Sequence, residues 1–214
     1  FASVPVEYDV GTSNPLGSDH YLFALATDAT TVPSGVNFAL YCRVRTSGSM
    51  ELIQVGANNA TDSRVATWTG YRAAYSGLKV RLMFVFPSGD STTAPLIYAN
   101  GVDISSNFTF TANGTPPNWM PASLATAYYR QHFTAPPGCR FIPHAPILGA
   151  LTAAEVLDWT NTGRLPVWCE IGTGSMIAAY ASDFSSTNDS WTQNGGVTRT
   201  PNIDTNADGA GYPP

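Results

Sequence analysis

Apolar side chains recur at every second position along one stretch of the chain, between Trp68 and Gly89. These apolar positions are Leu78, Val80, Leu82, Phe84 and Phe86. Because successive side chains of a strand point to opposite faces, the alternation predicts a long strand with one apolar face. The opposite face begins polar and ends apolar, with Lys79, Arg81, Met83 and Val85. We therefore expect the strand to run from an exposed sheet edge into a covered region, as in a two-layer β-sandwich.

A second alternation ends at the turn Thr46-Ser47-Gly48. Its apolar positions are Val36, Phe38, Leu40, Cys42 and Val44, and the positions between them are Asn37, Ala39, Tyr41, Arg43 and Arg45. The second set predicts a face that is open to water. Further strands are expected at 21–27, 51–55, 96–100, 108–111, 127–133, 165–172 and 176–184, separated by clusters of Pro, Gly, Ser and Asn.

One helix is marked by a capping box at Thr152-Ala153-Ala154-Glu155, followed by Val156, Leu157 and Trp159. In a capping box the hydroxyl and the carboxylate each accept a hydrogen bond from a free backbone N–H. We expect a short helix of about two turns. Because helices do not alternate with the strands, the pattern favours an all-β antiparallel sandwich with long loops and one or two short helices.

Composition favours one large β-domain. The chain has 214 residues, of which 43% are hydrophobic and only 12% are charged, and Lys79 is its only lysine. Single β-sandwiches often reach this length. We see no repeat and no linker, so residues 1–187 are expected to form one domain. The polar, Gly-rich residues 188–214 lack periodicity and are expected to be an extended arm of that domain.

The charge excludes some classes of partner. A net charge of −5 with scattered arginines argues against a protein whose main task is binding nucleic acid. The chain has no apolar run of the roughly 18 to 20 residues that a membrane span needs, so we expect no stable membrane insertion. Cys42, Cys139 and Cys169 lack the spacing of a zinc site and are expected to be free, mostly buried thiols.

Candidate catalytic groups are few. The chain lacks the Gly-x-Ser-x-Gly motif of a nucleophile elbow. His20, His132 and His144 are not placed beside a nucleophile and an acid, and are expected to make ordinary hydrogen bonds. Glu170 and Asp183 lie on neighbouring expected strands, but isolated acids on a polar face are the simpler interpretation. We therefore expect no enzymatic activity and no cofactor.

The segment from Asp204 to Gly209 matches the first half of an EF-hand loop, with Asp204, Asn206 and Asp208 at the ligand positions. The twelfth ligand position would fall after Pro214, and we interpret the segment as a polar turn, with weak Ca²⁺ binding as the alternative. Four Asn-x-Ser/Thr sequons begin at Asn59, Asn107, Asn113 and Asn188. Roughly two or three sequons are expected by chance, because the chain is rich in Asn, Ser and Thr, so the four do not establish secretion.

Three parts of the chain resemble capsid proteins of picorna-like positive-strand RNA viruses, the group that includes dicistrovirus-, iflavirus- and marnavirus-like members. They are the segment Trp68 to Gly89, the run Tyr128-Tyr129-Arg130-Gln131-His132-Phe133 leading to Arg140-Phe141-Ile142-Pro143, and the pair Val167-Trp168-Cys169-Glu170-Ile171 and Ala179-Tyr180-Ala181-Ser182-Asp183-Phe184. They resemble an early strand, a middle strand before a Pro-bounded loop, and the last two strands of a viral jelly roll. Together they cover about a third of the chain.

The resemblance implies an eight-stranded jelly roll that assembles with copies of itself and sister subunits into an icosahedral shell around RNA. It also implies release from a polyprotein, which fits a chain that begins at Phe1. The expected location is the virion, assembled in the host cytoplasm, with a host receptor as a further partner. Direct contact with the genome is expected to be limited. Arg43, Arg45, Lys79 and Arg81 are the first candidates among the cations for facing the interior.

An alternative from another class is a secreted β-sandwich lectin, with Ca²⁺ held at Asp204 to Asp208. Tyr128, Tyr129 and the five tryptophans offer aromatic rings for stacking on a sugar, although such rings more often belong to cores and interfaces. An enzyme of glycan metabolism is a third reading.

Overall fold

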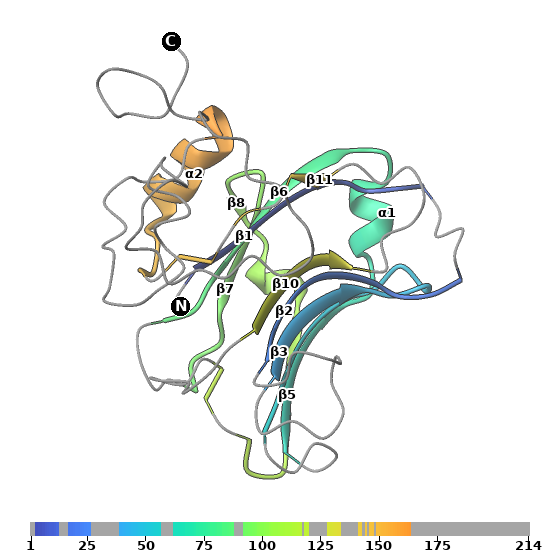
Figure 1. Ribbon diagram of the computed structural model, residues 1–214, viewed down its shortest axis with the longest axis vertical. Coiled ribbons are helices and arrows are strands. Elements are labelled where there is room, and N and C mark those ends of the chain that lie inside the picture. The colour runs from blue at the N-terminus through green and yellow to red at the C-terminus, as the bar shows by residue number, and fades with distance from the viewer. Residues whose placement is uncertain are drawn as a thin grey trace.

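Strands make up about half of the described residues, and they lie in two layers. The computed structural model describes residues 3–12, 17–26, 39–56, 62–87, 92–116, 118–119, 128–133, 141–142, 144, 146–147 and 149–163 (Figure 1). The strands expected at 165–172 and 176–184 and the arm expected at 188–214 lie outside these residues. So do the calcium candidates Asp204, Asn206 and Asp208, the acids Glu170 and Asp183, and Cys139 and Cys169.

Each layer is an antiparallel sheet. Sheet A has five described strands, in the order β11-β1-β6-β7-β8. They are β1 Ser3–Asp9, β6 Lys79–Val85, β7 Leu96–Ala99, β8 Val102–Asp103 and β11 Phe141–Ile142. Among the residues that the structure describes, sheet B has six strands in the order β10-β2-β3-β4-β5-β9. They are β2 His20–Ala26, β3 Ala39–Val44, β4 Met50–Val55, β5 Ser63–Trp68, β9 Thr109–Asn113 and β10 Tyr128–Phe133. The all-β antiparallel sandwich is confirmed.

The described strands outnumber the eight that the resemblance implied. Four of them, β1, β5, β8 and β11, were not expected from the sequence pattern. β8 and β11 have two residues each, which is too short for an alternation to be visible. The chain also runs through β2, β3, β4 and β5 in succession within sheet B before it returns to sheet A.

The main core lies between the two sheets and includes the expected apolar face of β6. Val80, Leu82, Phe84 and the following Phe86 are at most 1% exposed. From sheet B, Phe23 meets Phe84 edge to face, with 5.1 Å between ring centroids. The core residues contributed by β3 and β4 are Leu40, Cys42, Val44, Met50 and Leu52. Leu78 precedes the strand and is 51% exposed, so the apolar face is one residue shorter than expected.

The expectation that β6 starts at a sheet edge was wrong. β6 lies in the middle of sheet A, between β1 and β7. Its polar beginning has another cause, because Lys79 and Arg81 bind a carboxylate on the outer face of the sheet. The same face becomes apolar at Met83 and Val85, which are covered from outside the sheet.

The outer face of β3 is less polar than expected. Ala39 and Tyr41 are buried, whereas Arg43 is partly exposed. A separate apolar cluster explains the difference, since neighbouring strands contribute apolar side chains to the same face. Its buried members are Ala24, Ala26, Ala39, Tyr41, Ile53 and Val55.

In the described ranges, three short helices accompany the sheets: α1 Tyr71–Tyr75, the 3₁₀ turn η1 Ser105–Asn107 and α2 Ala153–Thr162. The helix predicted from the capping box is α2, whose ten residues exceed the expected two turns. It ends at Gly163, which adopts φ 72° and closes the last turn as glycine does most easily. α2 packs on the outer face of sheet A, away from sheet B (Figure 1). The residues buried there are Met83, Val85, Tyr98, Ile147, Leu151, Val156 and Trp159.

Loss of the capping box should weaken α2 measurably. Thr152 N donates to Glu155 Oε2 at 2.7 Å, and Glu155 N donates to Thr152 Oγ1 at 3.4 Å. We expect Thr152→Ala to lower the free energy of unfolding by about 1 kcal/mol, because one N–H of the first turn loses its acceptor. Urea denaturation monitored by circular dichroism measures this loss. Thr152→Ser keeps the hydroxyl and should lose much less; equal losses would contradict the role of the hydroxyl.

Candidate functional site

A buried carboxylate on the outer face of sheet A forms ion pairs with the two cations of β6. Glu7 of β1 is 2% exposed. It forms an ion pair with Lys79 through Oε1 and with Arg81 through Oε2, where the Nε–Oε2 distance is 3.2 Å. His144 Nε2 lies 3.5 Å from the same Oε2. We call these four residues the Glu7 cluster.

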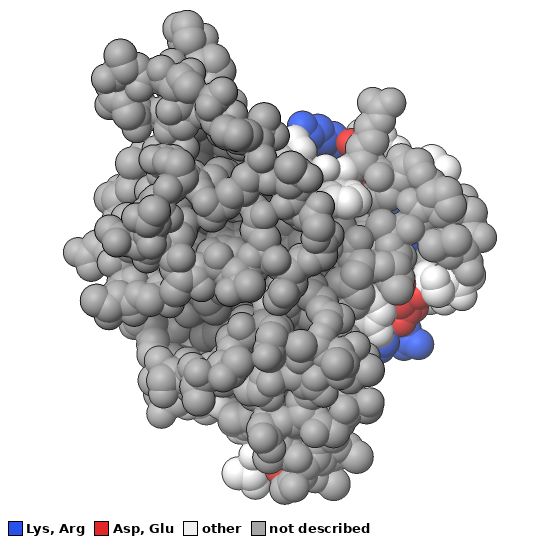
Figure 2. Space-filling model, viewed as in Figure 1, with Lys and Arg blue, Asp and Glu red and all other residues white. Residues whose placement is uncertain are grey.

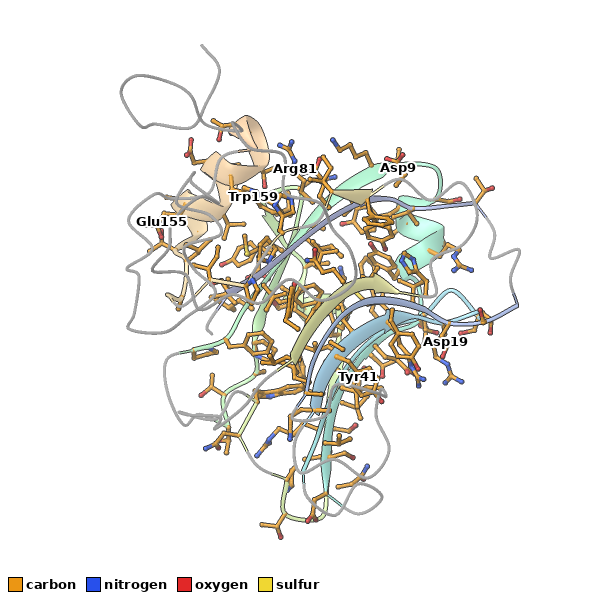
Figure 3. All side chains as sticks on the ribbon, viewed as in Figure 1. Asp9, Asp19, Tyr41, Arg81, Glu155 and Trp159 are labelled. Carbon is orange, nitrogen blue, oxygen red and sulfur yellow. The ribbon has the colours of Figure 1, made fainter. Side chains whose placement is uncertain are left out.

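The Glu7 cluster also holds the C-terminal end of α2. Arg81 Nη1 donates to the carbonyl oxygens of Thr160 and, at 3.4 Å, Trp159. These carbonyls carry the negative end of the helix dipole, which favours a cation. The His144 ring meets the Trp159 ring edge to face at 5.7 Å. Figure 3 shows Arg81 and Trp159 side by side where the helix meets the sheet.

The protonation states in the Glu7 cluster suit a structural role. Burial would raise the pKa of Glu7, but the hydrogen bonds and charges of Lys79 and Arg81 outweigh it and hold the pKa below its usual range. Burial lowers the pKa of His144, and the Glu7 carboxylate offsets only part of that effect. At neutral pH Glu7 is therefore ionised and His144 is neutral. The carboxylate has no proton to give, and its two oxygens are engaged by cations.

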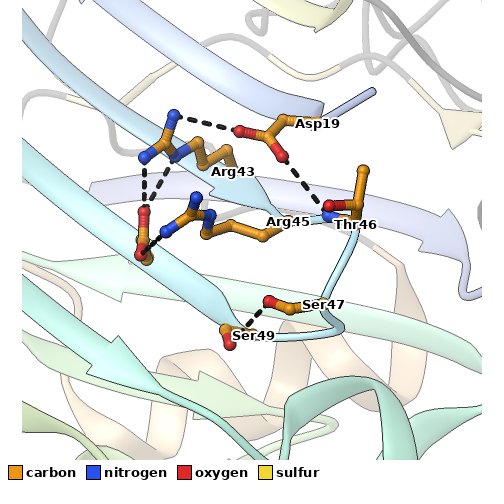
Figure 4. Close-up of polar contacts among 7 residues, drawn as sticks. Asp19, Arg43, Arg45, Thr46, Ser47 and Ser49 are labelled. Atoms are coloured by element: carbon orange, nitrogen blue, oxygen red, sulfur yellow. Dashed lines mark hydrogen bonds and ion pairs between the residues drawn. The ribbon is translucent and has the colours of Figure 1, made fainter. Parts of the chain in front are cut away.

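A second set of charges lies where β2, β3 and β4 begin or end (Figure 4). Arg43 Nη1 lies 3.0 Å from Asp19 Oδ2, and Arg43 Nη2 lies 2.7 Å from Glu51 Oε2. Arg45 Nη1 lies 3.3 Å from Glu51 Oε1. Burial opposes the charge of Arg43, but its bonds to Glu51 outweigh that effect and raise its pKa. We call Asp19, Arg43, Arg45 and Glu51 the Arg43 cluster; two cations balance two carboxylates.

The four cations expected to face a genome are thus paired within the chain. Arg43 and Arg45 bind carboxylates in the Arg43 cluster, and Lys79 and Arg81 bind Glu7. Figure 2 shows blue atoms directly beside red ones in two places on the face in view. A phosphate would have to compete with these carboxylates, so neither cluster is a ready site for nucleic acid.

A buried hydrogen bond joins β1 to α1. The hydroxyls of Tyr8 and Tyr71 lie 2.7 Å apart, and both side chains are at most 2% exposed. The His20 ring of β2 meets the Tyr8 ring edge to face at 5.4 Å. Burial, with a smaller contribution from the charge of Arg72, lowers the pKa of His20 to about 4. His20 is therefore a neutral packing group at physiological pH.

One edge of β1 pairs with β6. Three separate groups form hydrogen bonds along its other edge. Ser3 exchanges backbone hydrogen bonds with Ile147, at 3.1 and 2.7 Å. Glu7 and Tyr8 pair with β11. Between these points Gln131 of β10 takes the place of a strand, since its Nε2 donates to the carbonyl of Pro5 at 2.7 Å.

Gln131 also joins three parts of the fold. It belongs to sheet B, Pro5 belongs to sheet A, and Gln131 Oε1 accepts from the backbone N–H of His144 at 2.7 Å. One amide thus ties both sheets to the segment that leads into α2. A glutamine suits this position because its side chain both donates and accepts.

Replacement by leucine should destabilise the fold at Gln131 but not at Gln54. Gln131→Leu leaves the Pro5 carbonyl and the His144 N–H without a partner, and we expect it to cost about 2 kcal/mol of unfolding free energy. Gln54 is fully buried, but neither of its amide atoms has a partner in the described part of the chain. Gln54→Leu should therefore be neutral or stabilising. Urea denaturation of both variants measures the change in unfolding free energy. Equal losses of stability in Gln131→Leu and Gln54→Leu would contradict this prediction.

The residues singled out from the sequence do not converge. His20 lies against the core and His144 lies on the outer face of sheet A, while the side chain of His132 is outside the described residues. Cys42 is fully buried, as expected, and burial raises its pKa well above the usual range. Asn107 and Asn113 are exposed; Asn59 and Asn188 fall outside the described ranges.

Neither a metal cluster nor a membrane helix is found in the described ranges. No three His, Cys, Asp or Glu side chains among these residues are grouped as metal ligands. None of the helices described there has the length and apolar content needed to cross a bilayer.

Sequence reasoning missed Glu7 and Gln131, which make the most consequential polar contacts. A signal for Glu7 was present, because Val4, Val6 and Tyr8 alternate with Ser3, Pro5 and Glu7. An isolated acid on such a strand needs a cation from a neighbour. Nothing local marks Gln131, whose partners are 126 and 13 residues away in the chain.

Comparison of the chain with protein-family models, with curated proteins and with solved structures finds no match.

Proposed function

We propose that the chain is a structural subunit of the icosahedral shell of a picorna-like RNA virus. It assembles with copies of itself and with sister subunits, is located in the virion, and encloses the genome without a catalytic role or a cofactor. A host receptor is a further partner. The proposal starts from the resemblance of three segments and is supported by the architecture of the described residues.

The observation that carries the proposal is the two-sheet antiparallel sandwich whose described polar clusters hold its own elements together. The Glu7 cluster holds α2 on sheet A, and the Arg43 cluster joins three strands of sheet B. A scaffold of this kind presents rigid surfaces to neighbours. Shell subunits need such surfaces more than they need a reactive group.

We also propose that the sandwich is a jelly roll. In a Greek key, three successive strands are followed by one that returns beside the first. β10 likewise lies beside β2, after the chain has run through β3, β4 and β5 on the other side of β2 and has passed through sheet A. Jelly rolls are built from two Greek keys, so this arrangement supports the assignment.

Limited contact with RNA is consistent with the charges. The net charge is −5, and the four cations that we expected to face the genome are paired with carboxylates. We propose that the chain surrounds the genome mainly through shape and contacts between subunits.

Co-expression of the chain with the other proteins of its polyprotein, followed by negative-stain microscopy, tests the proposal. We expect closed particles in which the chain and its sister subunits are present in equal amounts. A chain that stays outside every particle and binds selectively on a glycan array would overturn the proposal in favour of the lectin.

A further inference from the structure

β9 is the last strand of sheet B on the side away from β10. One of its edges pairs with β5, from Ser63↔Asn113 to Thr67↔Thr109, and no described strand pairs with the other edge. Four of its five residues are exposed, and Phe110 is half-buried. An unpaired edge presents a row of backbone N–H and C=O groups to any strand that approaches.

The devices that usually protect such an edge are missing from β9. Natural edge strands carry lysines, prolines, inward-pointing charges or bulges that prevent pairing. β9 reads Thr-Phe-Thr-Ala-Asn, without charge or proline, and its register with β5 is continuous. The edge of β1 differs, since Ile147, Gln131 and β11 all cover it.

We propose that the outer edge of β9, which no described strand covers, pairs with β9 of a second copy of the chain, antiparallel about a twofold axis at Thr111. Sheet B would then continue from one copy into the other. The inference rests on the proposed function, because it names one contact through which copies of a shell subunit meet.

The side chains of β9 are complementary to themselves in this register. With Thr111 facing its counterpart, Thr109 faces Asn113 of the other copy on one side of the sheet. On the other side Phe110 faces Ala112, which pairs a large ring with a small side chain. A Thr–Thr pair of this kind stabilises a sheet modestly.

The absence of charge favours a second copy as the occupant. A twofold axis brings each position near its own equivalent, so a lysine or glutamate on β9 would meet a like charge. All five residues of β9 are neutral. A twofold contact also uses the same surface on both partners, which a single free edge satisfies without a second complementary surface.

Cross-linking through Thr111 tests the pairing. Thr111→Cys places two thiols on the axis, where facing residues lie about 4.5 to 5.5 Å apart between Cα atoms, within disulfide range. We expect mild oxidation to convert most of the full-length variant to a covalent dimer. Val102→Cys is the matched control: it lies on β8, is 64% exposed, and carries the same native cysteines. It should stay monomeric under the same oxidation.

A second variant tests the pairing without cross-linking. Thr111→Lys places like charges on the axis, and sedimentation should show at least a tenfold weaker dimer than the unmodified chain. Absence of cross-linking in Thr111→Cys, or unchanged self-association in Thr111→Lys, would overturn the proposal. Particles that form normally with an uncross-linked Thr111→Cys overturn only the β9 pairing. A cross-linked dimer that never enters particles overturns only the shell function.

Discussion

Replacement of Trp159 by alanine is expected to lower the free energy of unfolding by about 4 kcal/mol. Trp159 is fully buried between α2 and sheet A. It packs in the cluster that contains Met83 and Val85, and its ring contacts His144. Because sheet A cannot close over the lost ring, the substitution leaves a cavity under the helix.

Urea denaturation monitored by circular dichroism measures the loss of unfolding free energy. Two control variants test whether the loss comes from the buried ring. Trp159→Phe keeps most of the ring volume and should lose clearly less than alanine. Leu157→Ala removes a side chain of the same helix that is 48% exposed, so its effect should stay below about 1 kcal/mol. If Trp159→Ala and Leu157→Ala lose the same amount, α2 is not held by the buried ring.

Acidification should destabilise the fold through His20. The pKa of His20 is about 4 in the folded chain, because burial and the nearby Arg72 disfavour the charged form, and near 6.5 when exposed. Between these values the unfolded chain binds a proton that the folded chain excludes. The free energy of unfolding should therefore fall by about 1.4 kcal/mol for each pH unit between 6.5 and 4, about 3 kcal/mol in all.

His20 changes the stability only between these two pKa values. Above pH 6.5 His20 is neutral in both states, and below pH 4 it is charged in both, so neither range changes it. His20→Gln removes the titration, so the stability of the unmodified chain minus that of the variant should fall only inside this window. A difference that stays constant from pH 7.5 to 4 would contradict the buried, neutral His20. His144 acts in the same direction and remains in both proteins.

Local patterns predicted the elements whose stability depends on near neighbours. The alternation of Val80, Leu82 and Phe84 identified a strand and its core face, because both follow from the backbone period. The Thr152 and Glu155 pair identified the start of α2, because both partners lie in one turn. In such cases the sequence contains the whole interaction.

Other features depend on residues that are distant in the chain. The polar beginning of β6 was interpreted as a sheet edge, whereas Glu7, more than 70 positions earlier, supplies the charge that Lys79 and Arg81 neutralise. The outer face of β3 appeared wet because the side chains that bury Tyr41 come from other strands. Both errors arise because burial on the second face of a strand is set by tertiary contacts.

β2 contains an irregularity that the alternation of apolar residues did not predict. A bulge shifts the register with β3 between Tyr21 and Phe23. As a result Leu22 and Phe23, which are consecutive, both enter the main core. Strict alternation would have sent one of them outward. This bulge adds one residue to the strand without a residue type that marks it, so the sequence pattern does not reveal it.

The candidate site was harder to predict than the fold. Arg43, Arg45, Lys79 and Arg81 were identified from their charges, but their carboxylate partners were not, and those partners decide what the cations can do. Ion pairs between strands depend on register, which no single segment encodes.

The covered edge of β1 has a consequence for how the protein behaves when it is concentrated. Endless fibres require that each molecule offer two separate edges, one for the molecule before and one for the molecule after. Ile147, Gln131 and β11 occupy the outer edge of β1, so no incoming strand can stack there. A molecule that pairs through β9 therefore finds no second open edge at β1, and the chain should not form fibres in which β9 of one molecule pairs with β1 of the next.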